Sequence, residues 1–161
     1  MLEATEESVN SALKRSRAML RQRTRGAAMR DGALPSSSAD ERALVARFTR
    51  AFQSDDIDAV VALLTEDVWI SMPPMPFEWQ GQERARDVLR TLESGRQLVA
   101  TRANGQPAFG LYVPDPNARI LHAIGLLVLT LAGDRISAIT HFETGVLSTF
   151  GLPRILPRRP A

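Results

Sequence analysis

Two histidines are the residues of this sequence best suited to move a proton near neutral pH. His122 and His141 both fall in stretches whose period-two pattern predicts strands. His141 and Glu143 are two positions apart on one predicted strand, so we expect their side chains on the same face, where the ring could act as a general base. The alternative is that each histidine is an ordinary strand residue with a satisfied hydrogen bond or a solvent-facing ring. The sequence favours that alternative, because it places no second carboxylate clearly on the same interior face.

Other residue types add candidate partners for the histidines and exclude several kinds of site. Asp67, Tyr112 and Arg102 are additional candidates for partners of the histidines. The sequence has no cysteine, which excludes disulfides, thiolate chemistry and cysteine-based zinc sites. Two histidines and a scattered glutamate lack a recognisable metal-ligand spacing, and no glycine-rich phosphate loop or nucleophile elbow is present. We therefore expect neither a metal nor a cofactor.

A proline-rich stretch at 68–92 organises the elements around these residues. It predicts a strand at 68–72, a bend with three prolines, an aromatic return and a helix that begins at Gly81. Because proline lacks a backbone donor, the bend is expected at the rim of a sheet. The predicted pocket residues are Trp69, Met72, Met75, Phe77, Trp79, Tyr112, His122 and His141. A proline-stiffened loop that covers a core is the alternative, and it is favoured, since apolar rims without placed polar groups seldom identify a ligand site.

Helix signals precede this stretch and strand signals follow it. Ser38 and Glu41 form a capping box, which opens a helix with Leu44, Val45, Phe48 and Phe52 on one face. Ser54 or Asp55 is expected to cap a shorter helix with Ile57, Val60, Val61 and Leu64 inward. Strands are predicted at 97–104, 106–113, 119–131 and 135–143, with hairpin turns at Asn104-Gly105 and Gly133-Asp134 and a closing helical turn at Gly145–Phe150. Residues 39–152 are thus expected to form one α+β domain, a curved antiparallel sheet around three helices with a pocket at its open end.

The rest of the chain differs in composition. Residues 5–25 predict a separate helix with one apolar face and one basic face, which would suit either docking on a partner while touching phosphates or plain solvation. Residues 26–38 are typical of a linker, and residues 153–161 of a basic tail. Residues 1–30 carry a net charge of +4, whereas residues 31–150 carry −5, so the two parts are expected to have different partners.

Composition and length indicate the protein class. The 161 residues are 44% hydrophobic and 24% charged, as in a soluble globular protein. No apolar run is long enough to cross a bilayer, and the acidic N-terminus differs from a secretory signal. The sequence predicts a cytoplasmic protein without a membrane segment.

Two stretches carry resemblances to known families. The N-terminal MLEATEESVNSALKRSRAML resembles the end of region 4 in extracytoplasmic-function (ECF) sigma factors, whose recognition helix carries a similar VNSAL signature. The resemblance covers only that helix, and the first helix of the helix-turn-helix and the polymerase-binding region have no counterpart here. It implies that residues 1–25 are a remnant of a DNA reader. The residues it places at DNA are Thr5, Glu6, Ser8 and Asn10 towards the bases, with Lys14, Arg15 and Arg17 nearer the phosphates.

The second resemblance lies in the expected α+β domain, which we call the cone. DDIDAVVALLTEDVWISMPPMPFEWQG and TRANGQPAFGLY are similar to the SnoaL-like branch of the NTF2-like superfamily, as found at the C-terminus of certain ECF sigma factors. The two resemblances together imply a regulatory domain that modulates promoter recognition, with RNA polymerase core and promoter DNA as partners of the full-length protein. A small apolar ligand in the cone could bias its docking, although no residue identifies one. One alternative is a free-standing isomerase or hydrolase that uses His122 or His141 as base. The other is a binding domain that forms homodimers through its sheet.

Overall fold

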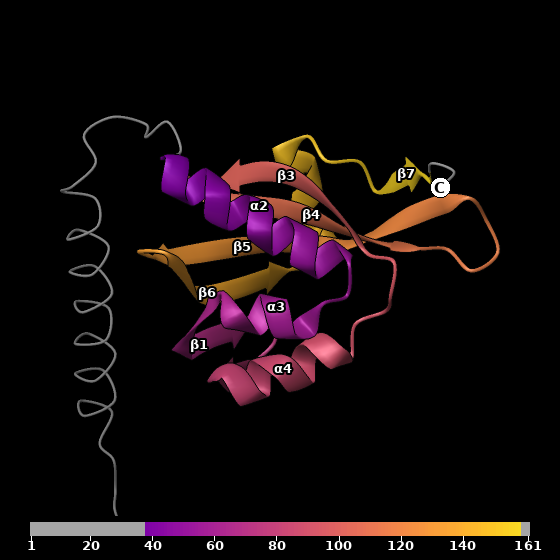
Figure 1. The fold of residues 1–161 in the computed structure, drawn as a ribbon. Coiled ribbons are helices and arrows are strands. Elements are labelled where there is room, and N and C mark those ends of the chain that lie inside the picture. Colours follow the sequence, from indigo (N-terminus) through magenta and orange to yellow (C-terminus); the bar gives the residue numbers. More distant parts are fainter. Residues whose placement is uncertain (1–37, 159–161) are drawn as a thin grey trace, which may run out of the picture. The chain divides into compact units, whose positions relative to one another are not determined.

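Residues 38–158 are described by the computed structural model, and in them helices lie against a curved, unclosed sheet (Figure 1). The elements are α2 (Ala39–Gln53), α3 (Ile57–Ala62), β1 (Leu64–Ser71), β2 (Glu78–Gln80), α4 (Gln82–Arg90), β3 (Gln97–Ala103), β4 (Gln106–Pro114), β5 (Ile120–Ala132), β6 (Arg135–Phe142), the 3-10 helix η1 (Thr144–Phe150) and β7 (Ile155–Pro157). This arrangement confirms the predicted α+β cone. None of the helices in this range has the length and apolar character needed to span a membrane.

The sheet has seven strands. Six follow the order β2-β1-β6-β5-β4-β3, and β7 pairs with β5. All pairings are antiparallel except that of β1 with β6, which is parallel. The predicted hairpin between β3 and β4 is confirmed, and both turn residues, Asn104 and Gly105, have positive φ values of 51° and 78°.

Helix α2 closes the inner face of the sheet because its apolar side chains recur at helical spacing. Its N-cap is confirmed, since Oγ of Ser38 accepts a hydrogen bond of 3.0 Å from the amide of Glu41. The ring of Phe48 lies 5.3 Å from that of Phe52 and 5.9 Å from that of Phe109, centroid to centroid. Full burial of each of these rings stabilises the fold by about 2–3 kcal/mol.

The junction between α2 and β1 differs from the prediction. Asp56, not Ser54 or Asp55, caps α3, because its carboxylate accepts from the amide of Ala59 at 3.0 Å. Asp55 instead has a positive φ and pairs at 2.7 Å with the guanidinium of buried Arg96. Leu64 does not belong to this helix but begins β1, where it pairs with a residue of β6.

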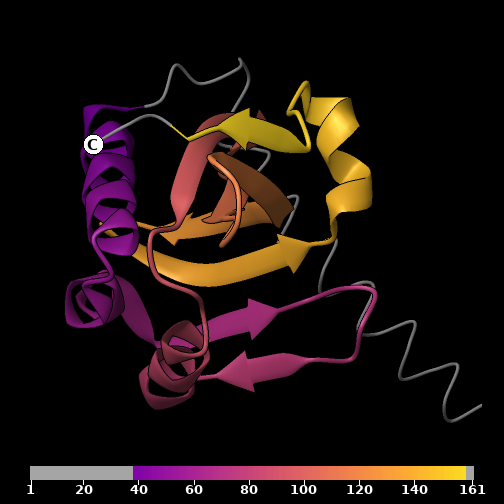
Figure 2. The ribbon, with the colours of Figure 1, turned by 90° about the vertical axis from the view of Figure 1, so that its right-hand side faces the viewer.

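The two faces of the sheet carry separate apolar clusters. The inner face packs against α2, α3 and α4, and the outer face packs against η1. Figure 2 shows α2 and η1 on opposite sides of the sheet. Strand β7, in the part of the sequence expected to be a tail, adds a pairing to the start of β5. The candidate cavity lies in the inner layer, between the sheet and helices α2 and α4.

Candidate ligand cavity

A cavity of about 190 Å³ lies between the inner face of the sheet and the helices. Its walls come from α2, α4 and strands β1, β4, β5 and β6. Apolar side chains make up most of the lining, among them Phe52, Ile70, Leu89, Leu111, Leu127 and Ile139. Such a space favours an apolar ligand over water, because water there would find few hydrogen-bond partners.

His141 is the one ionisable side chain among the residues that line this cavity. Burial lowers the pKa of His141 below its ordinary value of 6.5, while a backbone hydrogen bond at Ile124 and the charge of Glu143 act in the opposite direction. Nε2 of the ring is buried and has no hydrogen-bond partner among the described residues. At neutral pH the imidazole is thus uncharged, and its Nε2, which packs against Gly125, keeps one unused hydrogen-bonding position.

A bulge and a glycine make room for this imidazole. On β5, Gly125 pairs with Leu111 and Ala123 pairs with Tyr112, so Ile124 has no partner on β4. A Cβ atom on Gly125 would lie 2.8 Å from Cε1 of His141, and closer still to Nε2. The ring can occupy its position only because residue 125 has no side chain.

Of the eight predicted pocket residues, Met72 and His141 line the cavity. Trp79 pairs with Ile70 across β1 and β2, which puts it on the inner face, and its ring lies 6.0 Å from that of Phe77. Residue Phe77 is 49% exposed. Met72 also donates its backbone amide to the carbonyl of Phe77 at 3.1 Å. These aromatic rings therefore lie beside the cavity wall rather than inside it.

The other predicted pocket residues lie elsewhere. Trp69 alternates with Val68 and Ile70 on β1, so it faces outward and is 40% exposed. Tyr112 is buried, and its hydroxyl donates to the carbonyl of Pro153 at 2.7 Å, on the side of the sheet away from the cavity. Burial raises the pKa of Tyr112. Met75 is half-buried in the proline bend.

His122 does not share a site with His141. Its Nε2 lies 2.8 Å from a carboxylate oxygen of Asp115, on the hairpin between β4 and β5. The pKa of Asp115 is lowered by the backbone amide of Asn117 first and by His122 second. The proton chemistry expected of two histidines is thus limited to His141 in the cavity.

The predicted partners of the histidines are also separated. Asp67 is exposed on β1, and Arg102 pairs with Glu41 at 2.7 Å at the start of α2. β6 ends at Phe142, one residue before the predicted end, and Glu143 is the N-cap of η1. Its backbone is still extended, and its charge acts on His141. Within residues 38–158, no group of three or more His, Asp or Glu is placed to hold a metal ion.

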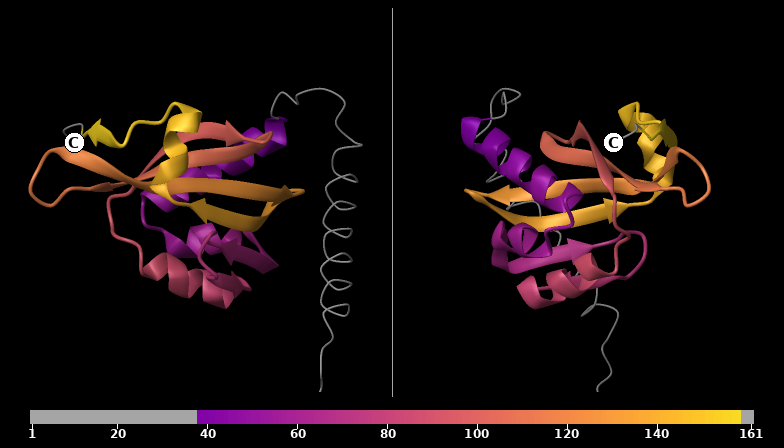
Figure 3. Two further views of the ribbon diagram at one scale, coloured as in Figure 1. Left: turned by 180° about the vertical axis from the view of Figure 1, so that it is seen from behind. Right: turned by 45° about the vertical axis from the view of Figure 1, so that its right-hand side comes forward.

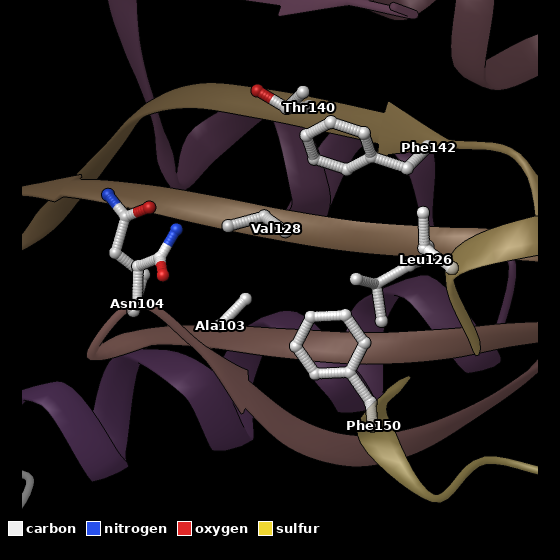
Figure 4. A pocket seen from close by; sticks show the side chains of 9 residues that line it. Ala103, Asn104, Leu126, Val128, Thr140, Phe142 and Phe150 are labelled. Carbon is white, nitrogen blue, oxygen red and sulfur yellow. The ribbon is translucent and has the colours of Figure 1, made fainter. Parts of the chain in front are cut away.

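A second hollow of about 210 Å³ lies on the outer face of the sheet (Figure 4). Leu126 and Val128 form its floor, with Phe142 and Phe150 towards one end and Asn104 at the other. Alternation along β5 sends Leu127 inward and its two neighbours outward, so the cavity and this hollow are on opposite faces. The sequence did not predict this hollow.

The predicted DNA-contacting residues lie outside the described part of the chain. They are Thr5, Glu6, Ser8, Asn10, Lys14, Arg15 and Arg17. Their role stays a prediction.

Comparison with known proteins agrees with this fold. Residues 45–139 match the profile of the SnoaL-like domain. The chain is 33% identical over 152 residues to the ECF RNA polymerase sigma factor SigG of Mycobacterium tuberculosis; the match covers 91% of this chain and 40% of SigG. The chain thus spans well under half the length of the curated relative it matches.

Two solved structures show the same fold at low sequence identity. An NTF2-like protein of unknown function from Burkholderia xenovorans superimposes with a TM-score of 0.55 and 11% identity, over 68% of this chain and 86% of its own. An LEH-like epoxide hydrolase from Mycobacterium tuberculosis superimposes with a TM-score of 0.52 and 21% identity, over 68% of this chain and 85% of its own. At these identities the likeness concerns the fold alone.

Proposed function

This chain belongs to the SnoaL-like domain family, and we propose that it is the C-terminal regulatory part of an ECF sigma factor. In this role the cone modulates promoter recognition and transcription initiation by RNA polymerase. The partners are then the polymerase core and promoter DNA, which residues 1–25 would help to contact.

The extent of the match to the sigma factor carries this proposal. Residues 38–161 make up about 77% of the chain, whereas the match covers 91% of it. The similarity therefore continues beyond the cone into residues 1–37. A free-standing cone enzyme would have no reason to share that segment with a transcription factor.

The cavity supports regulation by a small ligand. A cavity of about 150 Å³ lined by apolar side chains holds benzene, so about 190 Å³ suits a molecule of one or two rings. His141 would contact such a ligand through the part of its ring that lines the cavity, and a small shift of the ring away from Gly125 would let Nε2 form one hydrogen bond with it. The Phe77–Trp79 pair would form the rim through which it enters.

Catalysis is the second candidate, and the unpaired Nε2 is the observation that favours it. A neutral His141 could remove a proton from a bound substrate. Among the described residues, no carboxylate lines the cavity to orient the ring or to share the proton, which supports binding over turnover. Under the catalytic hypothesis, His141→Ala should abolish turnover with the fold intact, whereas His122→Ala should not.

Assembly with polymerase tests the sigma-factor proposal. The complete gene product that contains these residues is mixed with the core polymerase of its own organism and a fragment carrying its promoter. We expect a ternary complex that weakens as salt rises, because phosphate contacts release counterions. The control is the same mixture with a fragment lacking the promoter. A gene product that forms no complex with the core enzyme would contradict the proposal.

A further inference from the structure

A narrow arm extends from one end of the sheet, built from the end of β4, the start of β5 and β7 (Figure 3). We call residues 112–123 and 154–158 the basic arm. Ile120 pairs with Pro157 and His122 pairs with Ile155, so β7 runs antiparallel to β5 along the arm. The arm contributes neither to the cavity nor to the outer hollow.

Three exposed arginines share one face of the basic arm. The amide of Arg158 donates to the carbonyl of Arg119 at 3.0 Å, and the amide of Ala123 donates to the carbonyl of Arg154 at 2.9 Å. Arg119 therefore lies directly opposite Arg158, and the alternation of side chains puts Arg154 on the same face. Arg154 and Arg158 are four residues apart on this extended segment, or about 13 Å.

No acidic group in the described part of the chain forms an ion pair with these arginines. Among the described residues, no carboxylate lies within ion-pair distance of Arg119, Arg154 or Arg158. Asp115, the acid of the arm, is already engaged by His122 and by backbone amides. Like charges directly opposite on neighbouring strands repel each other. The arm is thus arranged to receive an anion from outside the described fold.

The sequence next to the arm adds to its positive charge. Arg159 follows Arg158, and no acidic residue occurs after Glu143. Guanidinium groups bind phosphate through two parallel N–H donors, which makes arginine well suited to a phosphodiester backbone.

We propose that the basic arm binds the phosphate backbone of duplex DNA, independently of base sequence. This inference rests on the proposed function, because a regulatory domain of a sigma factor works beside promoter DNA. A membrane surface fits less well, since membrane-bound segments need an apolar anchor on the side that meets the lipid. The exposed large apolar residue of the arm, Ile155, alternates with Arg154 and so faces away from the arginines. The pair on the arginine face, Leu121 and Leu156, is buried and half-buried respectively.

Salt-dependent DNA binding by the full chain, without polymerase, tests the proposal. The variant Arg119→Gln/Arg154→Gln/Arg158→Gln is titrated with a short duplex of arbitrary sequence between about 50 and 200 mM salt. Each lost phosphate contact lowers the slope of log K against log salt by about 0.9, so we expect a slope smaller by roughly 2.7. Over that salt range the original chain should lose about 40-fold more affinity than the variant.

Matched variants separate this effect from general charge. Arg47→Gln/Arg50→Gln/Arg84→Gln removes three exposed arginines from α2 and α4 and should leave the slope within about 1 of the original. Replacing the three arm arginines by lysine keeps the charge and should keep most of the slope, and Arg119→Gln alone should lower it by about 0.9.

Equal slopes for the arm variant and the helix variant would overturn the proposal. A loss confined to vesicles of anionic phospholipid, with DNA binding unchanged, would also overturn it. Because polymerase is absent, a negative result here leaves the sigma-factor proposal standing, and a failure to assemble with polymerase leaves this slope unaffected.

Discussion

Replacing Gly125 by alanine is the sharpest perturbation of the cavity. The new methyl group would lie 2.8 Å from Cε1 of His141 and closer still to Nε2 and to the backbone oxygen of Phe142. The oxygen is held in the β5–β6 ladder, so the strain cannot be relieved by a simple side-chain rotation. Overpacking of this kind costs about 1–3 kcal/mol, and the fixed backbone atom places the expected loss of unfolding free energy at about 3 kcal/mol.

Thermal unfolding measures this loss. For a domain of this size, about 3 kcal/mol lowers the melting temperature by roughly 10 °C. Gly145→Ala is the matched control, because a Cβ there meets no atom within 4 Å and should change stability by less than about 0.5 kcal/mol. The displaced ring should also become more exposed, so its pKa, followed by NMR, should rise towards 6.5. If the two alanine variants unfold at the same temperature, the close packing of ring and glycine described above is refuted.

Two further outcomes follow from the cavity. Because burial lowers the pKa of His141, the unfolded chain takes up a proton first as the pH falls. The contribution of His141 to the free energy of unfolding should therefore be constant above about pH 6.5 and should fall as the pH drops below it. His141→Phe, compared with the original chain by denaturant unfolding at each pH, should lose this contribution. If the Trp79 ring forms the entrance to the cavity, Trp79→Ala should weaken binding of a small aromatic probe, measured by calorimetry, without a loss of thermal stability. Lower thermal stability with unchanged affinity would mean that the ring only packs on the core.

The regular part of the fold could be predicted because local patterns and packing agree. The N-cap at Ser38, the hairpin at Asn104 and the period-two strands each have a direct physical cause, and the structure has all three. The second half of the predicted capping box is not seen, because the carboxylate of Glu41 pairs with Arg102 instead. Where two neighbouring residues suited the same role, the sequence did not show which of them takes it. Asp55 and Asp56 are equally good caps by type, and the distant Arg96, which draws Asp55 away, decides between them.

The cavity was harder to predict because it depends on which face each residue occupies. Tyr112 alternates with Leu111 on β4 and so faces outward, but the sequence alone did not show which of the two faces of β4 meets the helices. The bulge at Ile124 breaks the alternation along β5, so the face of residues before it could not be read from those after it. An isolated glycine within a strand pattern is a known sign of a bulge or a close backbone approach, and Gly125 was therefore the available signal. The partner of His122 depends on hairpin geometry, which residue types alone did not specify.

Run-off transcription tests the central claim most directly. The complete gene product is compared with a version from which residues 38–161 are removed, each with core polymerase and the same promoter. We expect the complete protein to yield a promoter-specific transcript and the truncated version to yield a different amount, because the cone modulates initiation. A complete protein that directs no transcript, or two versions with equal yield, would contradict the account.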